Sequence, residues 1–139
     1  MGNTNRVFRM QRDLDMRIAA RKIMNRHLGE DLPFGRLVDL TLESAAPGYY
    51  LSADYAVRML SQYRRGLLPE STGELKMLMW RELSGRVDDV MRHYRIGDLA
   101  TSVRYVLALG DASRFFVSRD VATRILARPW VAGGKGVRR

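Results

Sequence analysis

The chain contains 139 residues, 46% of them hydrophobic and 28% charged, and it has no cysteine. This composition predicts one compact globular domain, and it excludes a chain that is disordered as a whole, a disulfide framework and any cysteine-based metal site or nucleophile. The net charge of +9 comes almost entirely from arginine, a side chain suited to phosphate and guanine contacts. Nucleic acid, in particular double-stranded DNA, is therefore one natural partner; the alternative is that the arginine excess is only compositional.

The first residues are polar and arginine-rich, so we expect no secretory leader. The longest apolar runs fall far short of the roughly 20 residues that a bilayer span needs. No glycine-rich phosphate loop, zinc motif or nucleophile elbow is present in the sequence. We therefore expect a soluble, cytoplasmic, non-enzymatic protein that uses no cofactor or metal and does not contact a membrane.

The first predicted helix covers residues 5–29, a stretch without proline and without glycine until Gly29. Its apolar residues form two stripes at helical spacing. The first stripe contains Met16, Ala20, Ile23, Met24 and His27. The second stripe contains Val7, Met10, Leu14 and Ile18. We therefore expect this helix to be covered on more than one side, with Arg6, Arg9 and Arg12 marking an exposed start.

A second helix is expected over residues 34–44, with Asp31 as its N-cap and Pro33 near its start. The residues expected to face the core are Phe34, Leu37, Val38 and Leu42. The helix stops before a Pro-Gly pair, which breaks both helices and strands.

Residues 49–51 are expected to run extended before a third helix, which Ser52 caps and Gly66 closes. The apolar side of this helix contains Tyr55, Ala56, Met59, Leu60 and Tyr63. Residues 67–73 form a linker, and the sequence Ser-Thr-Gly-Glu over 71–74 is a capping box that starts the next helix.

The fourth helix is expected over residues 72–94, the fifth over 98–109 and the sixth over 118–127, where Pro129 stops it. The apolar line of the fourth helix contains Leu75, Met79, Leu83, Val90 and Tyr94. The remaining residues, 131–139, are expected to form a disordered basic tail.

Two stretches of the chain, 49–60 and 115–126, share one pattern. Each reads as two aromatics, an aliphatic, Ser, any residue, Asp, any residue, Ala, any residue, Arg and two aliphatics. The two histidines, His27 and His93, are separated by the same offset as the two stretches. A constant offset over several motifs indicates a tandem duplication.

The predicted fold is therefore all-α, with three-helix repeats over residues 1–66 and 74–130. Each repeat alone is of marginal size for independent folding, so we expect the two to share buried surface as one pseudo-symmetric domain. Tyr50 and Phe116 are expected to pack near an internal two-fold axis.

The stretch from Val117 to Leu126 resembles the recognition helix of LacI-type helix-turn-helix repressors, in which a Val-Ser step opens a helix bearing Val, Arg and Leu. Residues 51–60 resemble it less closely. The resemblance implies DNA binding, but the links over 45–51 and 111–117 are longer than the turn of that motif. The pattern is also similar to small uncharacterised bacterial and phage proteins, which implies no activity.

The outward faces of the third and sixth helices carry the candidate DNA-binding residues. Asp54 precedes Arg58, and Asp120 precedes Arg124, by four residues. Each pair is either an intrahelical ion pair, which contributes little stability, or part of a face that reads DNA. Phosphate contacts are assigned to arginines outside these pairs, namely Arg64, Arg65, Arg119 and Arg128.

The aromatic pairs, Tyr49-Tyr50 and Phe115-Phe116, have two interpretations. Either they stack on nucleobases, as in single-strand binders, or they anchor the loops to the core with Tyr49 and Phe115 half exposed. The two histidines are expected to be structural hydrogen-bonding groups. Two functions stay open, DNA binding through arginine-rich faces and a protein-interaction module. Clustered arginines would favour the first, and exposed apolar patches the second.

Overall fold

The computed structural model describes residues 2–128, and it folds into six helices with no strand in that range. The helices are α1 (Gly2–Arg26), α2 (Phe34–Leu42), α3 (Ala53–Arg64), α4 (Glu74–Tyr94), α5 (Leu99–Leu109) and α6 (Arg119–Ala127). The all-α prediction with six helices is confirmed, and each helix overlaps its predicted range. Pro129 and the predicted tail over 131–139 lie outside the described residues.

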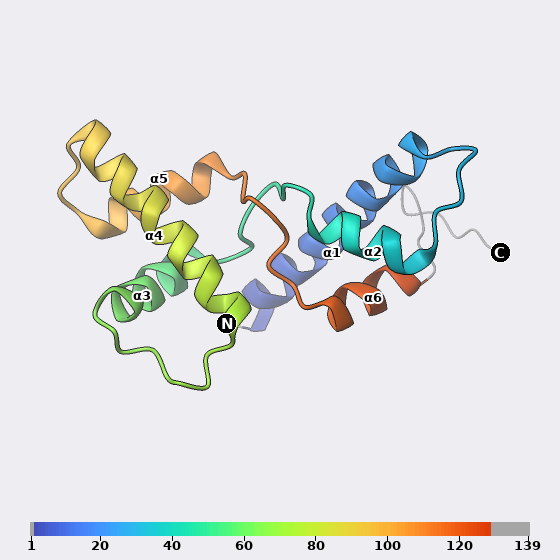
Figure 1. Ribbon diagram of the computed structural model, residues 1–139. Helices are drawn as coiled ribbons and strands as arrows, with labels where there is room; N and C mark the ends of the chain where they lie inside the picture. Colours follow the sequence, from blue (N-terminus) through green and yellow to red (C-terminus); the bar gives the residue numbers. More distant parts are fainter. Residues whose placement is uncertain (1, 129–139) are drawn as a thin grey trace.

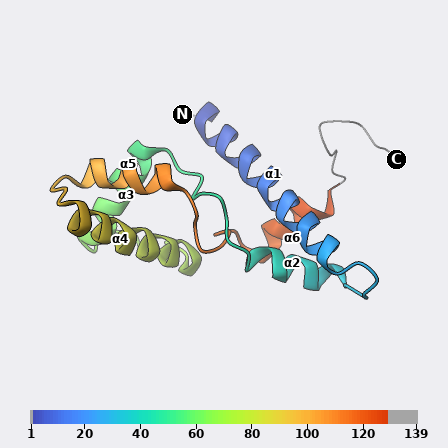
Figure 2. The ribbon, with the colours of Figure 1, turned by 90° about the horizontal axis from the view of Figure 1, so that it is seen from above.

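The helices form two bundles, each of which takes helices from both halves of the chain (Figures 1 and 2). In the first bundle α1, α2 and α6 pack together, and in the second α3, α4 and α5 pack together. Helix α3 does not contact α2, and α6 does not contact α5, although each pair is consecutive in the described chain. The third helix of each predicted repeat is therefore exchanged into the bundle of the other repeat.

Two crossovers, residues 45–51 and 111–117, carry the chain between the bundles and lie against each other (Figure 1). Ala46 and Ala112, which occupy equivalent positions in the two predicted repeats, form an antiparallel bridge with N···O distances of 3.0 and 2.8 Å. Gly110 precedes the second crossover with a φ of +71°, and a Cβ there would lie 2.4 Å from the carbonyl oxygen of Pro47. The crossing therefore requires glycine at this position.

Aromatic rings stack across the two crossovers. Tyr49 stacks on Phe116 with ring centroids 6.2 Å apart, and Tyr50 stacks on Phe115 at 6.4 Å. The first aromatic residue of each motif therefore stacks on the second aromatic residue of the other motif. The expected half exposure of Tyr49 and Phe115 is wrong, because these two rings are 6% and 1% exposed whereas Tyr50 and Phe116 are partly buried.

The buried residues follow most of the apolar stripes that the sequence predicts. In the first bundle Met16, Ala20 and Ile23 of α1 are buried against α2 and α6. In the second bundle Trp80 and Leu83 of α4 are buried, and α4 packs against α3 and α5. The other buried residues on the described helices include Leu37, Val38, Leu42, Ala56, Leu60, Val103, Val106, Ala122, Ile125 and Leu126.

The second apolar stripe of α1 is not covered, so the expectation that this helix packs on more than one side is wrong. Its exposed residues are Val7 (62%), Met10 (62%), Leu14 (50%) and Ile18 (45%). Among the described helices α1 contacts only α2 and α6, and both lie on the face of Met16 and Ala20. Phe34 is also 44% exposed instead of buried, because α2 begins at the end of its bundle farthest from the crossovers (Figure 1).

Two of the predicted helix caps form and two do not. Ser52 accepts a hydrogen bond from the backbone N–H of Tyr55, and Ser118 accepts one from Val121, both at 3.2 Å. The predicted caps before α2 and α4 are wrong, because Pro33 and Gly73 occupy the N-cap positions and neither has a capping side chain. Helix α2 begins at Phe34 and α4 at Glu74, too far along the chain for Asp31 and Ser71 to stand directly before their first turns. The first backbone N–H groups of both helices therefore lack a side-chain partner.

Candidate functional site

The structure places two of the predicted DNA-binding arginines in contacts between helices. Arg64 of α3 forms an ion pair with Asp88 of α4 at 2.7 Å and also donates to Ser84 at 2.9 Å. Arg119 of α6 donates to Asp39 of α2 at 2.8 Å and to the carbonyl oxygen of Gly35 at 3.2 Å. The Asp39 carboxylate also raises the pKa of Arg119. Both arginines therefore join helices within a bundle.

The remaining predicted phosphate-binding arginines, Arg65 and Arg128, are exposed but far apart. Arg65 follows the end of α3 and Arg128 follows the end of α6. Because α3 and α6 belong to different bundles, the arginine cluster that would favour duplex binding does not form (Figures 1 and 2).

The predicted intrahelical ion pairs are absent from residues 2–128. Asp54 accepts instead from Arg104 of α5 at 3.1 Å, and the guanidinium carbon of Arg58 lies 5.5 Å from the ring centre of Tyr55. Arg124 and Asp120 are both exposed and do not form an ion pair with each other. An exposed pair at this spacing gains only a few tenths of a kcal/mol, so a carboxylate readily adopts a competing contact.

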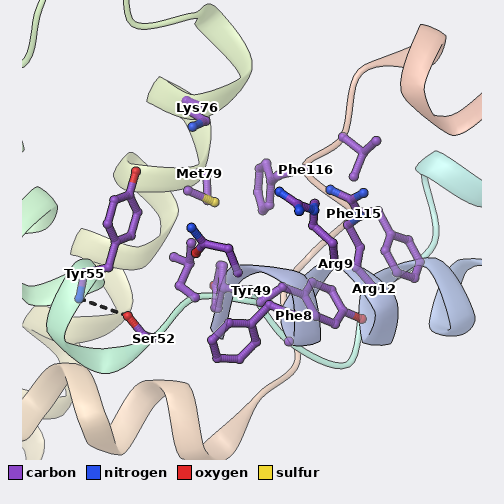
Figure 3. Close-up of a pocket in the computed structure, with 15 residues that line it drawn as sticks. Phe8, Arg9, Arg12, Tyr49, Ser52, Tyr55, Lys76, Met79, Phe115 and Phe116 are labelled. Carbon is purple, nitrogen blue, oxygen red and sulfur yellow. Dashed lines mark hydrogen bonds between the residues drawn. The ribbon is translucent and has the colours of Figure 1, made fainter. Parts of the chain in front are cut away.

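A cleft of about 340 Å³ lies between the N-terminal half of α1, the crossovers and the first turns of α3 and α4 (Figure 3). Its aromatic residues are Phe8, Tyr49, Tyr50, Tyr55, Phe115 and Phe116. Its cationic residues are Arg9, Arg12 and Lys76. Among the described residues that line the cleft, none carries a carboxylate. The cleft therefore joins flat apolar rings to positive charge.

The cationic wall of the cleft belongs to the same face of α1 that enters the core. Arg9, Arg12, Met16 and Ala20 follow one another at spacings of three or four residues. The C-terminal part of this face is apolar and buried in the first bundle. The N-terminal part carries Arg9 and Arg12, whose side chains point towards the crossover that bears Phe116 (Figure 3).

The two arginines on this wall differ in their partners. Arg12 is half-buried, and its guanidinium donates to Asp13 at 2.9 and 3.0 Å. Arg9 is exposed and forms no ion pair within residues 2–128. Lys76 of α4, on the opposite wall, is likewise exposed and unpaired in the described part of the chain. Two of the three cations are therefore available to an anionic ligand.

Hydrogen bonds to both bundles fix the aromatic floor of the cleft. The hydroxyl group of Tyr49 donates to Glu82 of α4 at 2.6 Å and accepts from Arg86 at 3.0 Å. The hydroxyl group of Tyr50 donates to Asp15 of α1 at 2.7 Å. Burial, followed by the bond to Glu82, raises the pKa of Tyr49 to about 12, and burial with the bond to Asp15 also raises the pKa of Tyr50. Both phenols therefore stay neutral around pH 7.

Arg86 adds a second connection between α4 and the crossovers. Its guanidinium donates to the carbonyl oxygens of Gly110 and Asp111 at 3.0 and 2.9 Å, and it lies over the ring of Tyr49 at 5.7 Å. Tyr50 adopts a φ of +61°, an uncommon conformation for a bulky residue that costs about 1 kcal/mol or more. The bond to Asp15 and the stack on Phe115 hold this residue in place.

One aromatic ring of the cleft has no aromatic or cationic neighbour among the described residues. Five rings already stack on another ring or lie under a guanidinium, namely Tyr49, Tyr50, Tyr55, Phe115 and Phe116. Phe8 has no such contact among the described residues, and it is only partly buried. Phe8 is therefore a ring of the cleft on which a planar ligand can stack without displacing an aromatic or cationic neighbour.

Sequence reasoning missed Phe8 and Lys76, and it treated Arg9 and Arg12 only as the exposed start of a helix. The predicted repeat does not mark these residues, because the positions equivalent to Phe8, Arg9 and Arg12 in its second copy are Glu74, Leu75 and Leu78. The available signal was the position of Arg9 and Arg12 on the face that continues into the core stripe.

Other predicted chemistry has structural roles or is absent from the described residues. His27 contacts Glu30 at 3.0 Å, and the ring of His93 lies edge-on to Tyr94. Residues 2–128 contain no cluster of metal-ligating side chains, and no helix in that range is long and apolar enough to cross a membrane. Comparisons with protein-family models, curated proteins and solved structures found no match to this chain.

Proposed function

We propose that the protein binds nucleic acid without catalysing a reaction, and that an unpaired nucleotide occupies the cleft. The observation that carries this proposal is the composition of the cleft wall, which has three cations, six aromatic residues and no carboxylate among its described residues. Phosphate and nucleobase require these two kinds of side chain within reach of each other.

The phosphate and the base of a nucleotide each have matching groups in the cleft. Arg9 and Lys76 supply unpaired positive charge for a phosphate, and the guanidinium of Arg12 lies beside that of Arg9 (Figure 3). Phe8, which has no aromatic or cationic neighbour among the described residues, offers a ring for a base. A volume of about 340 Å³ is at the lower end of small-ligand sites, so it accepts a single nucleotide unit and excludes a base-paired duplex.

The sequence alone favours double-stranded DNA as the ligand, whereas the size of the cleft favours a single strand. The expected duplex site depended on Arg64, Arg65, Arg119 and Arg128, which are paired between helices or separated between bundles. The net charge of +9 still attracts any polyanion, and it supports contacts to phosphates that flank the occupied cleft.

Anisotropy of a labelled oligothymidine strand and of its duplex, at several salt concentrations, tests the proposal. The single strand is expected to bind more tightly than the duplex at every salt concentration. For single strands log K falls with log salt by about 0.7 per phosphate contacted. Arg9→Ala and Lys76→Ala are each expected to weaken binding about tenfold and to flatten the slope by about 0.7.

Two further variants separate stacking from charge. Phe8→Ala is expected to weaken binding by about 1–3 kcal/mol without changing the salt slope, and Phe8→Trp is expected to preserve binding. Arg36→Ala removes an exposed charge from α2, away from the cleft, and serves as the charge control. A duplex preference, or binding that Arg9, Lys76 and Phe8 do not affect, would contradict the proposal.

A further inference from the structure

The outer face of α1 carries an apolar stripe that no described helix covers. The stripe consists of Val7, Met10, Leu14 and Ile18, which are between 45% and 62% exposed. Successive members are three or four residues apart, so they form one line along the helix. The line lies opposite Met16, Ala20 and Ile23, which face the bundle. Four large apolar side chains in one line are more than the scattered exposure normal for a surface helix.

Positive charge accompanies this stripe. Arg6 and Lys22 are exposed, and each is four residues from a member of the stripe, so they flank it on the helix surface. Of the carboxylates at similar spacing, Asp13 is neutralised by its ion pair with Arg12, and Asp15 is held on the side of the crossover, where it accepts from the hydroxyl of Tyr50. The surface offered to a partner is therefore apolar along its centre and cationic at its edges.

We propose that this stripe docks an acidic amphipathic helix of another protein. A line with about one apolar residue per turn matches the seam of a two-helix pair. Acidic residues beside the partner's own seam would meet the cations that flank the stripe, which gives charge complementarity.

Two other occupants fit this face less well. A second copy of α1 would bring cationic flanks together, and like charges oppose such pairing. A bilayer surface is bound by wider apolar faces that include Trp or Phe, whereas this stripe is narrow and has no aromatic residue. The stripe also lies on a different side of α1 from Arg9 and Arg12, so this inference does not depend on nucleic-acid binding.

Isothermal titration with designed peptides tests the docking proposal on the full chain. The probe is a synthetic heptad peptide with Leu at the a and d positions and Glu at the e and g positions. The matched peptide has Lys in place of Glu. The acidic peptide is expected to bind and the basic peptide is not. Leu14→Asp is expected to weaken binding at least about tenfold, because the Leu14 side chain would be buried on docking.

A matched variant and a folding control accompany this test. Leu109→Asp places the same charge at an equally exposed leucine of α5 (54% exposed, against 50% for Leu14), and it is expected to leave peptide binding unchanged. Thermal melts are expected to show both variants folded. Three outcomes would overturn the proposal: neither peptide binds, phosphatidylserine vesicles bind in a Leu14-dependent manner, or the chain self-associates in sedimentation through Leu14.

Discussion

At the scale of single residues, Glu82 connects the crossovers to α4. Its carboxylate accepts from the hydroxyl of Tyr49 at 2.6 Å, from the backbone N–H of Ser113 at 3.0 Å and from the hydroxyl of Ser113. Burial by itself raises the pKa of Glu82, but the bonds from Ser113 and Tyr49 and the charge of Arg86 outweigh it, so the pKa is lowered overall. The ionised form of Glu82 therefore favours the folded state.

This lowered pKa gives a prediction for acid stability. Because the pKa of Glu82 is lower in the folded state than its ordinary value of 4.5, its contribution is present above that value and is lost as pH falls through the folded pKa. Thermal melts at stepwise lower pH are expected to show a steeper loss of Tm in the wild type than in Glu82→Gln. Glu74→Gln, at an exposed carboxylate of α4, is expected to follow the wild type. If Tm falls equally steeply with decreasing pH in all three proteins, then the ionised form of Glu82 does not stabilise the fold in this way.

At the scale of elements, α3 and α6 depend on their buried leucines. Leu60 is 0% exposed and Leu126 is 4% exposed, on the faces that pack into the second and first bundles respectively. Short helices gain most of their stability from such packing and little from intrinsic propensity. Leu60→Ala and Leu126→Ala are therefore each expected to cost about 2–5 kcal/mol in urea denaturation. Leu109→Ala, at a half-exposed leucine, is expected to cost well under half of that, and equal costs would show that the buried faces are misassigned.

Helix α1 shows what the spacing of apolar residues can predict about a helix and what it cannot. Both of its stripes are apolar in sequence, but only the stripe with Met16 meets other helices, while that with Leu14 faces solvent. Spacing identifies residues that share a face, and the partner of each face is decided by tertiary packing. Ser52 and Ser118 were predictable as caps because the residues that directly follow each one form a helix, but the same local rule also placed caps before α2 and α4, where none forms.

The candidate site was less predictable than the helices for the same reason. Arg64 and Arg119 look like free surface charges in sequence, but Asp88 and Asp39 on other helices meet them in the fold. The cleft is built from α1, the crossovers and the starts of α3 and α4, and no local pattern brings these segments together.

At the scale of the whole molecule, the constant offset between the two motifs predicts a repeat but not the exchange of its third helix. The same offset would arise if α3 packed on α1 and α2. In the structure α3 instead packs on α4 and α5, and the chain reaches them through an extended crossover. The Ala46–Ala112 bridge and the ring stacks hold the two crossovers together. Each predicted repeat thereby completes the core of the other, as expected if each alone is too small to fold.

The exchange gives a prediction about a cut chain. A specific protease site placed between Glu70 and Ser71, both exposed in the link between α3 and α4, divides the chain at the boundary of the predicted repeats. Because α3 packs with α4 and α5, and α6 packs with α1 and α2, the two fragments are expected to stay together. Native size-exclusion chromatography of the cut protein is expected to give one peak containing both fragments, with the helical circular-dichroism signal of the intact chain.

Separating the fragments completes this test. After separation in urea and removal of the denaturant, each fragment alone is expected to lose most of its helical signal, because each bundle then lacks helices that its core requires. Mixing the fragments is expected to restore that signal, with a melting temperature that rises with concentration, since folding has become bimolecular. If the fragments instead separate without denaturant and each melts cooperatively alone, then α3 packs with α1 and α2, α6 packs with α4 and α5, and the exchange is wrong.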